Sequence, residues 1–167
     1  KRSPKILKDV LESDLPILGI CYGMHLLSHM NAGKVVSGDS REYGAADVEV
    51  LRSQGVFDGL AVGKKFPVWM SHGDSVGEVP KEAIVTARSE RCPVVAFQMG
   101  NFHAVQFHPE VAHTSIGNQI LSNFLFRVAG LRATWKMENF LETKAHEILE
   151  RVGDREVIGG VSGGVDS

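Results

Sequence analysis

The sequence has only two cysteines among its 167 residues, Cys21 and Cys92, which are too few for a disulfide framework. No run reaches the roughly 18 consecutive apolar residues that a membrane-spanning helix needs. Polar positions follow the basic start, Lys1 and Arg2, where a signal peptide would have its apolar core. We also find no internal repeat and no low-complexity tract. These absences lead us to expect a reduced, cytoplasmic protein.

The chain also lacks an excess of charge of either sign. Its 18 Lys and Arg residues and 20 Asp and Glu residues leave a formal net charge of −2. The sequence therefore gives no indication of a nucleic-acid partner or of binding to a membrane surface. With 43% hydrophobic residues and 18 glycines, the composition is that of a globular protein, and the length alone favours one domain.

The first thirty residues predict a helix, a strand and a second helix. Ser3 is a favoured N-cap and Pro4 a favoured first helical residue. The apolar run of residues 15–20 is typical of a strand buried on both faces, and helical spacing follows at residues 22–30. This order is the repeating unit of a parallel α/β sheet. We therefore expect an α/β fold.

The rest of the chain alternates short apolar runs with Gly, Pro, Asp and Ser, which predicts strands, and then shows helical spacing. A further buried strand is expected just before a Ser- and Gly-rich end. The predicted strands are 34–36, 48–51, 68–70, 84–87, 94–98, 104–107 and 157–161, and the predicted helices are 116–128 and 136–152.

Cys21 lies between Gly19 and Gly23 where the predicted strand turns into a helix, which is the pattern of a nucleophile elbow with Cys in place of Ser. We expect glycine to be favoured at both positions, since side chains there would collide in the sharp turn. The helix N-terminus should lower the pKa of the thiol, and the Tyr22 N–H should be free to bind an oxyanion. Alternatively Cys21 is a small buried hydrophobe, the role that we assign to Cys92.

A thiolate nucleophile needs a base and a group that orients the base. Of the seven histidines, His108 follows the predicted strand 104–107 and precedes Pro109 and Glu110. The two-residue period of a strand would point His108 and Glu110 the same way, at an edge where α/β sheets hold their sites. The alternative is that His108 is a loop residue beside a proline.

Two strings, Gly-Ile-Cys-Tyr-Gly-Met at residues 19–24 and Val-Gln-Phe-His-Pro-Glu at residues 105–110, together resemble the class I (triad) glutamine amidotransferases. The resemblance implies a flavodoxin-like mixed α/β sheet. It also implies that Cys21 attacks the side-chain amide of glutamine, that His108 transfers protons and that Glu110 orients His108.

The resemblance extends to the substrate site. Residues 69–74, Trp-Met-Ser-His-Gly-Asp, resemble the segment that contacts the α-carboxylate and amine of glutamine, which gives Ser71 and His72 a role; the alternative is a turn with a surface histidine. His25 departs from the pattern, because many members have there a Gln that holds the substrate amide. The glycine-rich loop that carries the second oxyanion donor is also missing before Cys21, so we expect the N-terminal part of this domain to precede residue 1.

The last six residues follow a predicted strand and are rich in Ser and Gly. Such a turn converges backbone N–H groups on phosphate, although the Lys of a Walker loop is absent, and a flexible tail is the alternative. The string resembles the loop of the ATP pyrophosphatases, which implies that ATP binds there with Mg²⁺. Its residues are Ser162, Gly163, Gly164, Val165, Asp166 and Ser167.

Both motifs in one chain resemble the two-domain, glutamine-dependent ligases of purine synthesis. There, ATP activates XMP as an adenylate, and ammonia from glutamine converts it to GMP. The resemblance divides the chain into an amidotransferase domain, 1–130, and residues 131–167, the linker, helix, strand and phosphate loop that open a Rossmann-like ATP pyrophosphatase domain. It further implies a homodimer formed through regions beyond Ser167. We assign no metal ligands within the chain.

Two alternatives remain open. The chain could belong to a different triad amidotransferase, such as one that serves CTP or anthranilate synthesis. It could also be an inactive binding module whose partner supplies the missing oxyanion donor.

Overall fold

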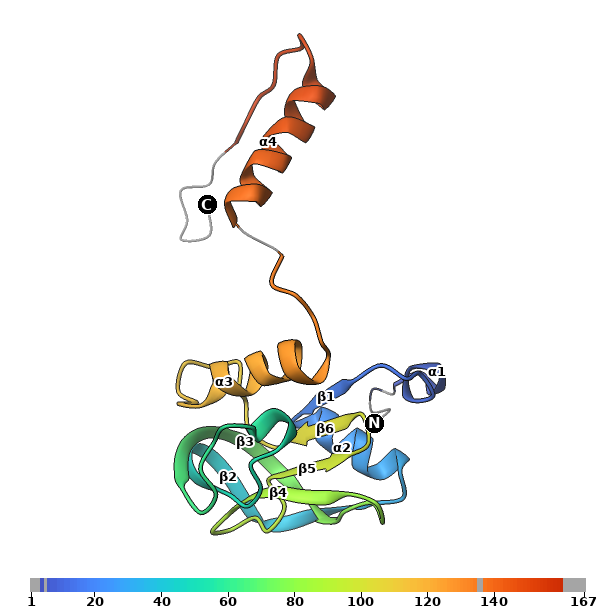
Figure 1. Ribbon diagram of the computed structural model, residues 1–167, viewed down its shortest axis with the longest axis vertical. Coiled ribbons are helices and arrows are strands. Elements are labelled where there is room, and N and C mark those ends of the chain that lie inside the picture. Colours follow the sequence, from blue (N-terminus) through green and yellow to red (C-terminus); the bar gives the residue numbers. More distant parts are fainter. Residues whose placement is uncertain (1–3, 5, 135–136, 161–167) are drawn as a thin grey trace. The chain divides into compact units, whose positions relative to one another are not determined.

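The computed structural model describes residue 4, residues 6–134 and residues 137–160 (Figure 1). The chain divides into two compact units, residues 1–131 and residues 132–167. In the described part of the chain, no helix is both long enough and apolar enough to cross a membrane.

The first helix is shorter than the sequence predicts. It forms α1, Lys8–Leu11, with Leu7 at its N-cap position, whereas the predicted cap, Ser3, lies outside the described residues. None of the α1 residues is buried. Leu11 is partly buried against a hydrophobic cluster, and a helix of this length gains little from its own hydrogen bonds.

Within the described residues, six strands form one mixed sheet in the order β1-β6-β5-β4-β2-β3 (Figure 1). β1 and β6 pair in parallel, and the other neighbouring strands pair antiparallel. The parallel unit expected from the opening residues is thus limited to one pair, because short connections join most strands in the middle of the chain and favour antiparallel pairing. The strands are β1 (Ile17–Ile20), β2 (Lys34–Val50), β3 (Lys65–Glu78), β4 (Ile84–Ser89), β5 (Ala96–Met99) and β6 (Phe102–Val105).

The strand β2 combines two segments that the sequence separates. Its 17 residues include the predicted strand 34–36 and residues 48–50 of the predicted strand 48–51, together with the polar residues between them. β3 pairs along β2 with a register shift between Ser37 and Glu42. Because this pairing gives the backbone its hydrogen bonds, the strand continues through residues that by themselves indicate a turn.

Both faces of the sheet carry a hydrophobic core. The neighbours Ala96 and Phe97 belong to different hydrophobic clusters, because successive strand side chains point to opposite faces. Leu27 of α2 (Tyr22–Met30) packs in the cluster of Phe97, and Ile120 of α3 (Gly117–Ser122) packs in that of Ala96. The predicted helix 116–128 is α3 followed by the π-helical segment η2. The helical segments after α1 are α2 (Tyr22–Met30), η1 (Gly55–Phe57), α3 (Gly117–Ser122), η2 (Asn123–Val128) and α4 (Met137–Val152).

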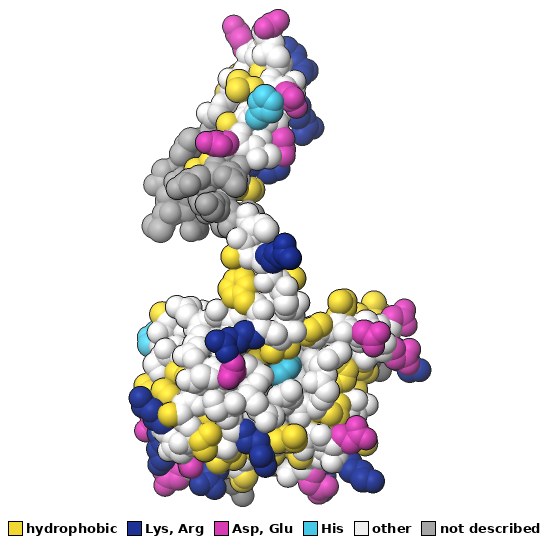
Figure 2. Space-filling model, in the orientation of Figure 1, with side chains coloured by type: hydrophobic (Ala, Val, Ile, Leu, Met, Phe, Trp, Pro, Cys, Tyr) yellow, Lys and Arg dark blue, Asp and Glu magenta, His cyan; other side chains and the backbone are white. Residues whose placement is uncertain are grey.

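The second unit contains α4, which confirms the helix predicted at residues 136–152. Apolar side chains such as Leu141 and Leu149 are exposed on α4, and hydrophobic side chains lie among acidic and basic ones on its surface (Figure 2). Residues 155–160 have no regular secondary structure, so the strand predicted at 157–161 is not formed in its described part. Among the described residues, no strand pairs with this segment to complete its backbone hydrogen bonds. The proposed phosphate loop, residues 162–167, lies outside the described residues.

Candidate active site

Cys21 occupies the turn between β1 and α2 and has a φ of 51°. A positive φ is uncommon for a residue other than glycine, and such backbone strain is typical of functional sites. The Cys21 N–H donates to the carbonyl oxygen of Val105, the last residue of β6, at 2.8 Å. Because β1 and β6 are parallel, Cys21 lies where both strands end. The predicted strand–turn–helix geometry is confirmed.

The two glycines around Cys21 differ. A Cβ on Gly19 would lie 2.8 Å from the backbone of Gly23 and 2.7 Å from Cδ1 of Leu27, whereas a Cβ on Gly23 would have no atom within 4 Å. The prediction that a side chain would collide at both positions is therefore correct for Gly19 and wrong for Gly23. The Cα–Cβ direction at Gly19 leads into the helix backbone, and that at Gly23 leads into open space.

The thiol of Cys21 is not activated by the helix N-terminus alone. Burial is the largest influence and raises the pKa of Cys21 above its ordinary value. Hydrogen bonds from the Tyr22 backbone N–H and the Gln106 side chain act in the opposite direction, and the negative charge of Glu110 raises the pKa further. The prediction of a lowered pKa for the Cys21 thiol is therefore wrong, because the net shift of the pKa is upward. A nucleophile with a raised pKa depends on a base to remove its proton.

His108 and Glu110 form a hydrogen-bonded pair, with 2.6 Å between Nδ1 of His108 and Oε1 of Glu110. The strand β6 ends at Val105, so the pair lies in the following loop rather than on the strand itself. The His108 N–H donates to the Trp69 carbonyl oxygen at 3.0 Å. The Thr114 hydroxyl donates to the His108 carbonyl oxygen at 2.6 Å and accepts the Trp69 N–H at 3.1 Å. These bonds attach the loop to β3.

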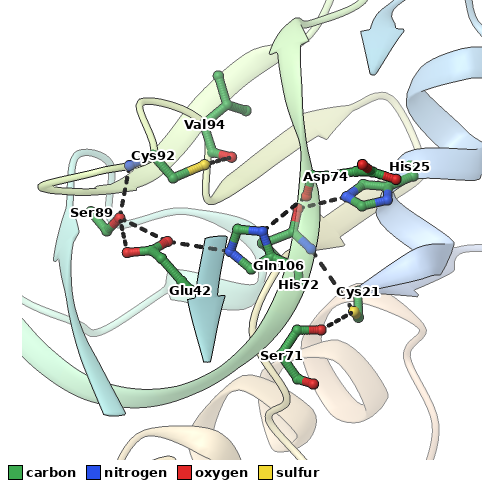
Figure 3. Close-up of polar contacts among 10 residues, drawn as sticks. All are labelled: Cys21, His25, Glu42, Ser71, His72, Asp74, Ser89, Cys92, Val94 and Gln106. Atoms are coloured by element: carbon green, nitrogen blue, oxygen red, sulfur yellow. Dashed lines mark hydrogen bonds and ion pairs between the residues drawn. The ribbon is translucent and has the colours of Figure 1, made fainter. Parts of the chain in front are cut away.

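Two sets of contacts bring Cys21 and the His108–Glu110 pair to the same edge of the sheet, where β1 and β6 end. Cys21 is bonded to Val105, three residues before His108. Its Sγ also lies 3.6 Å from the carbonyl oxygen of Ser71 (Figure 3), and β3 carries both Ser71 and the residue that binds the His108 backbone. The electrostatic effect of Glu110 on Cys21 reflects this proximity. Nδ1 of His108 is bonded to the carboxylate, which leaves Nε2 as the nitrogen able to exchange protons.

His72 follows Ser71 on β3, but its imidazole is buried away from the thiol. Its Nδ1 bonds the Asp74 carbonyl oxygen at 2.9 Å and its Nε2 lies 3.2 Å from Oε2 of Glu42 (Figure 3). The Ser89 hydroxyl donates to the same carboxylate at 3.1 Å. Hence Ser71 reaches Cys21, whereas His72 belongs to a buried network that joins β2, β3 and β4. The alternative of a surface histidine at position 72 is wrong.

His25 reaches Cys21 through another side chain. Its Nε2 lies 2.8 Å from Oε1 of Gln106, and Nε2 of Gln106 donates to Sγ of Cys21 at 3.9 Å (Figure 3). Sequence reasoning assigned no role to Gln106 or to Glu42. The signal for Gln106 was its place inside the string Val-Gln-Phe-His-Pro-Glu, two residues before His108.

Cys92 is fully buried and its Sγ–H donates to the carbonyl oxygen of Val94 at 3.3 Å, as expected for a packing residue. In the part of the chain that the structure describes, no group of three or more His, Cys, Asp and Glu side chains is arranged to hold a metal ion.

A mixed sheet with a cysteine on its strand–helix turn and a His–Glu pair beside it is the arrangement that the class I glutamine amidotransferase resemblance implies. Residues 1–128 match the family model of the class-I glutamine amidotransferases, and the chain belongs to this family.

Curated proteins to which the chain is similar include several that are named GMP synthase [glutamine-hydrolyzing]. It is 44% identical over 167 residues to the GMP synthase [glutamine-hydrolyzing] of Maridesulfovibrio salexigens, covering 99% of this chain and 32% of the relative. It is 48% identical over 165 residues to the enzyme of that name from Thermomicrobium roseum, covering 99% and 31%. The chain thus spans about a third of the length of the curated relatives that it matches.

Solved structures agree with the fold. A protein from Thermoplasma acidophilum, described as one of the subunits of a GMP synthase, matches with a TM-score of 0.69 and 30% identity, over 83% of this chain and 65% of that one. A glutamine amidotransferase from Thermotoga maritima matches with a TM-score of 0.58 over 86% of this chain and 57% of that one, and at 24% identity it supports the fold alone.

Proposed function

We propose that this chain forms the glutamine-hydrolysing part of a GMP synthase, with Cys21 as nucleophile, His108 as base and acid, and Glu110 as the group that orients His108. The observation that carries the proposal is the 2.6 Å hydrogen bond between His108 and Glu110, located where the strained turn at Cys21 ends β1. Membership of the class-I amidotransferase family supports the same reaction.

In the first half of the reaction, Sγ of Cys21 attacks the side-chain carbonyl carbon of glutamine while Nε2 of His108 takes the thiol proton. The raised pKa of Cys21 makes this proton transfer necessary. The Tyr22 N–H, which already bonds Sγ, donates to the oxyanion. His108 then returns the proton to the amide nitrogen, the C–N bond breaks, and ammonia leaves a γ-glutamyl thioester.

In the second half, water attacks the thioester carbon and His108 takes one of its protons. The C–S bond breaks, glutamate leaves, and the thiol is restored when the proton returns to sulfur. Glu110 accepts the hydrogen bond from Nδ1 of His108 throughout, which fixes the imidazole and stabilises its positive charge. The backbone around Ser71 would hold the α-carboxylate and α-amino groups of glutamine. The buried His72 would support β3, the strand that carries Ser71.

The use of the ammonia is proposed from the relatives. Proteins named GMP synthase [glutamine-hydrolyzing] match nearly all of this chain, which supports amination of XMP with ATP and Mg²⁺ in the complete protein. Residues 162–167 would hold the pyrophosphate part of ATP. We propose a cytoplasmic homodimer assembled through regions beyond Ser167.

The decisive experiment compares the two cysteines in the full-length protein. Cys21→Ala should lower the glutaminase rate by about 10³-fold or more, because the covalent step is lost, and should retain GMP formation from added ammonia. Cys92→Ala is the matched control and should keep glutaminase activity. Glutamine hydrolysis that survives in Cys21→Ala would disprove the nucleophile.

The ATP loop needs its own variant, because the synthetase reaction can fail independently of the glutaminase. Asp166→Ala should abolish ATP-dependent GMP formation and retain glutamine hydrolysis. An Asp166→Ala protein that forms GMP at the original rate would refute the loop assignment.

A further inference from the structure

Gln106 is a fully buried side chain that connects His25 to Cys21 (Figure 3). Its backbone N–H donates to the carbonyl oxygen of Val95 at 2.7 Å, and Val95 directly precedes β5. This bond fixes the backbone of Gln106. His25 lies four residues after Cys21 and its N–H bonds the Cys21 carbonyl oxygen at 3.4 Å, which places both on the same side of α2. Gln106 is therefore held at both ends: Val95 bonds its backbone N–H, and His25 contacts its side-chain amide.

The direction of the Gln106 amide decides its effect on sulfur. An amide offers an oxygen that only accepts hydrogen bonds and an NH₂ group that only donates them. Oε1 of Gln106 faces His25 at 2.8 Å, which requires a hydrogen on Nε2 of His25. The NH₂ group then faces Sγ of Cys21. The opposite direction would place oxygen lone pairs against the thiolate, and a charged acceptor gains most from a donor.

We infer that Gln106 is a further catalytic residue whose NH₂ group stabilises the Cys21 thiolate, and that His25 is a positioning residue that fixes the direction of the amide. The inference rests on the proposed role of Cys21 as nucleophile. Because Nε2 of His25 carries its hydrogen in the protonated ring and in one neutral tautomer, His25 can hold the amide in either charge state.

Two donors face the sulfur, while one acceptor, the Ser71 carbonyl oxygen at 3.6 Å, and one negative charge oppose the thiolate. The Tyr22 N–H and the Gln106 NH₂ group favour the thiolate, and the carboxylate of Glu110 opposes it. His25 contributes without touching the sulfur, since its contact is with Oε1 of Gln106. A structural role for His25 would change stability, whereas the proposed role changes the ionisation of Cys21.

The test measures how fast iodoacetamide alkylates Cys21 as a function of pH in the full-length protein, by mass spectrometry of the Cys21 peptide. Gln106→Leu should raise the midpoint by about one pH unit, which is about tenfold slower alkylation below the midpoint. His25→Leu should shift it in the same direction, and His25→Gln, which retains an N–H donor, should restore it. His29→Leu, an exposed histidine on the same helix, is the matched control and should leave the midpoint unchanged.

Folded Gln106→Leu and His25→Leu proteins with unchanged midpoints would overturn the inference. His25→Leu keeps the test valid if the buried Gln106 tolerates no leucine, because His25 is only half-buried. A His25→Leu protein that shows a raised KM for glutamine and an unchanged midpoint would make His25 a substrate-binding residue instead. Alkylation requires no turnover, so this outcome is distinct from failure of the proposed function, which glutamine hydrolysis by Cys21→Ala would reveal.

Discussion

Replacing each of the two glycines around Cys21 with alanine should have opposite effects on stability. In Gly19→Ala, the new methyl group would lie 2.8 Å from the carbonyl carbon and oxygen of Gly23, where ordinary contacts begin at 3.4 Å. The Leu27 methyl group at 2.7 Å can rotate away, but the helix backbone cannot. The turn must therefore open by about 0.6 Å at the position that holds Cys21.

The magnitude follows from these contacts. Overpacking of this kind costs about 1–3 kcal/mol of unfolding free energy. Gly23→Ala places its methyl group in open space and replaces a flexible residue in the first turn of α2, which gains up to about 1 kcal/mol. The two variants should therefore differ by about 1–4 kcal/mol, and Gly19→Ala should be the less stable.

Urea denaturation of the two full-length variants and the wild type, followed by circular dichroism, measures this difference. Gly19→Ala should also lose glutaminase activity, because Cys21 moves with the turn. Equal stability of Gly19→Ala and wild type, or a Gly23→Ala protein as unstable as Gly19→Ala, would refute the reasoning from the Cβ directions.

Three further predictions concern titration, charge and burial. Burial lowers the pKa of His103 from its ordinary 6.5 to about 4, so the unfolded state binds the extra proton. Unfolding free energy should fall by up to about 3 kcal/mol as the pH drops from 6.5 to 4, and a His103→Gln protein that retains the full slope in urea titrations would contradict this. Glu110→Gln should slow glutamine hydrolysis about tenfold or more. It should nevertheless speed alkylation of Cys21 at a given pH, because the charge that raises the thiol pKa is removed. Slower alkylation of Cys21 in this variant would contradict the prediction. Glu42→Leu leaves the buried partners His72 and Ser89 without their carboxylate and should lower the unfolding free energy by about 3 kcal/mol in urea denaturation. Glu49→Leu breaks an exposed pair with Arg88 and should lower it by at most about 1 kcal/mol. Equal losses in the two variants would refute this prediction.

Local patterns in the sequence predicted the parts of the site that depend on a few neighbouring residues. The Gly-x-Cys-x-Gly spacing between an apolar run and a helical pattern predicts the turn at Cys21, and the structure confirms it. The spacing of His108 and Glu110 predicted that their side chains point the same way. They do form a hydrogen bond, although in a loop, where bonds from Trp69 and Thr114 replace the strand as the support.

The ionisation of Cys21 illustrates an effect that a local pattern misjudges. A helix N-terminus adjoins Cys21, and its N–H group does favour the thiolate. Burial depends on every segment packed around the sulfur, and its larger, opposite effect becomes visible only when those segments are assembled.

The sequence by itself determined the family, the nucleophile candidate and its His–Glu partners, because each depends on short strings with a fixed chemistry. The tertiary structure alone decided which buried side chains contact and support these residues. His72 is a buried partner of Glu42 because β2 and β3 pair, and Gln106 reaches Cys21 because β1 and β6 are parallel neighbours. Such contacts join residues 30 and 85 positions apart. Strand pairing sets them, and no local spacing encodes strand pairing.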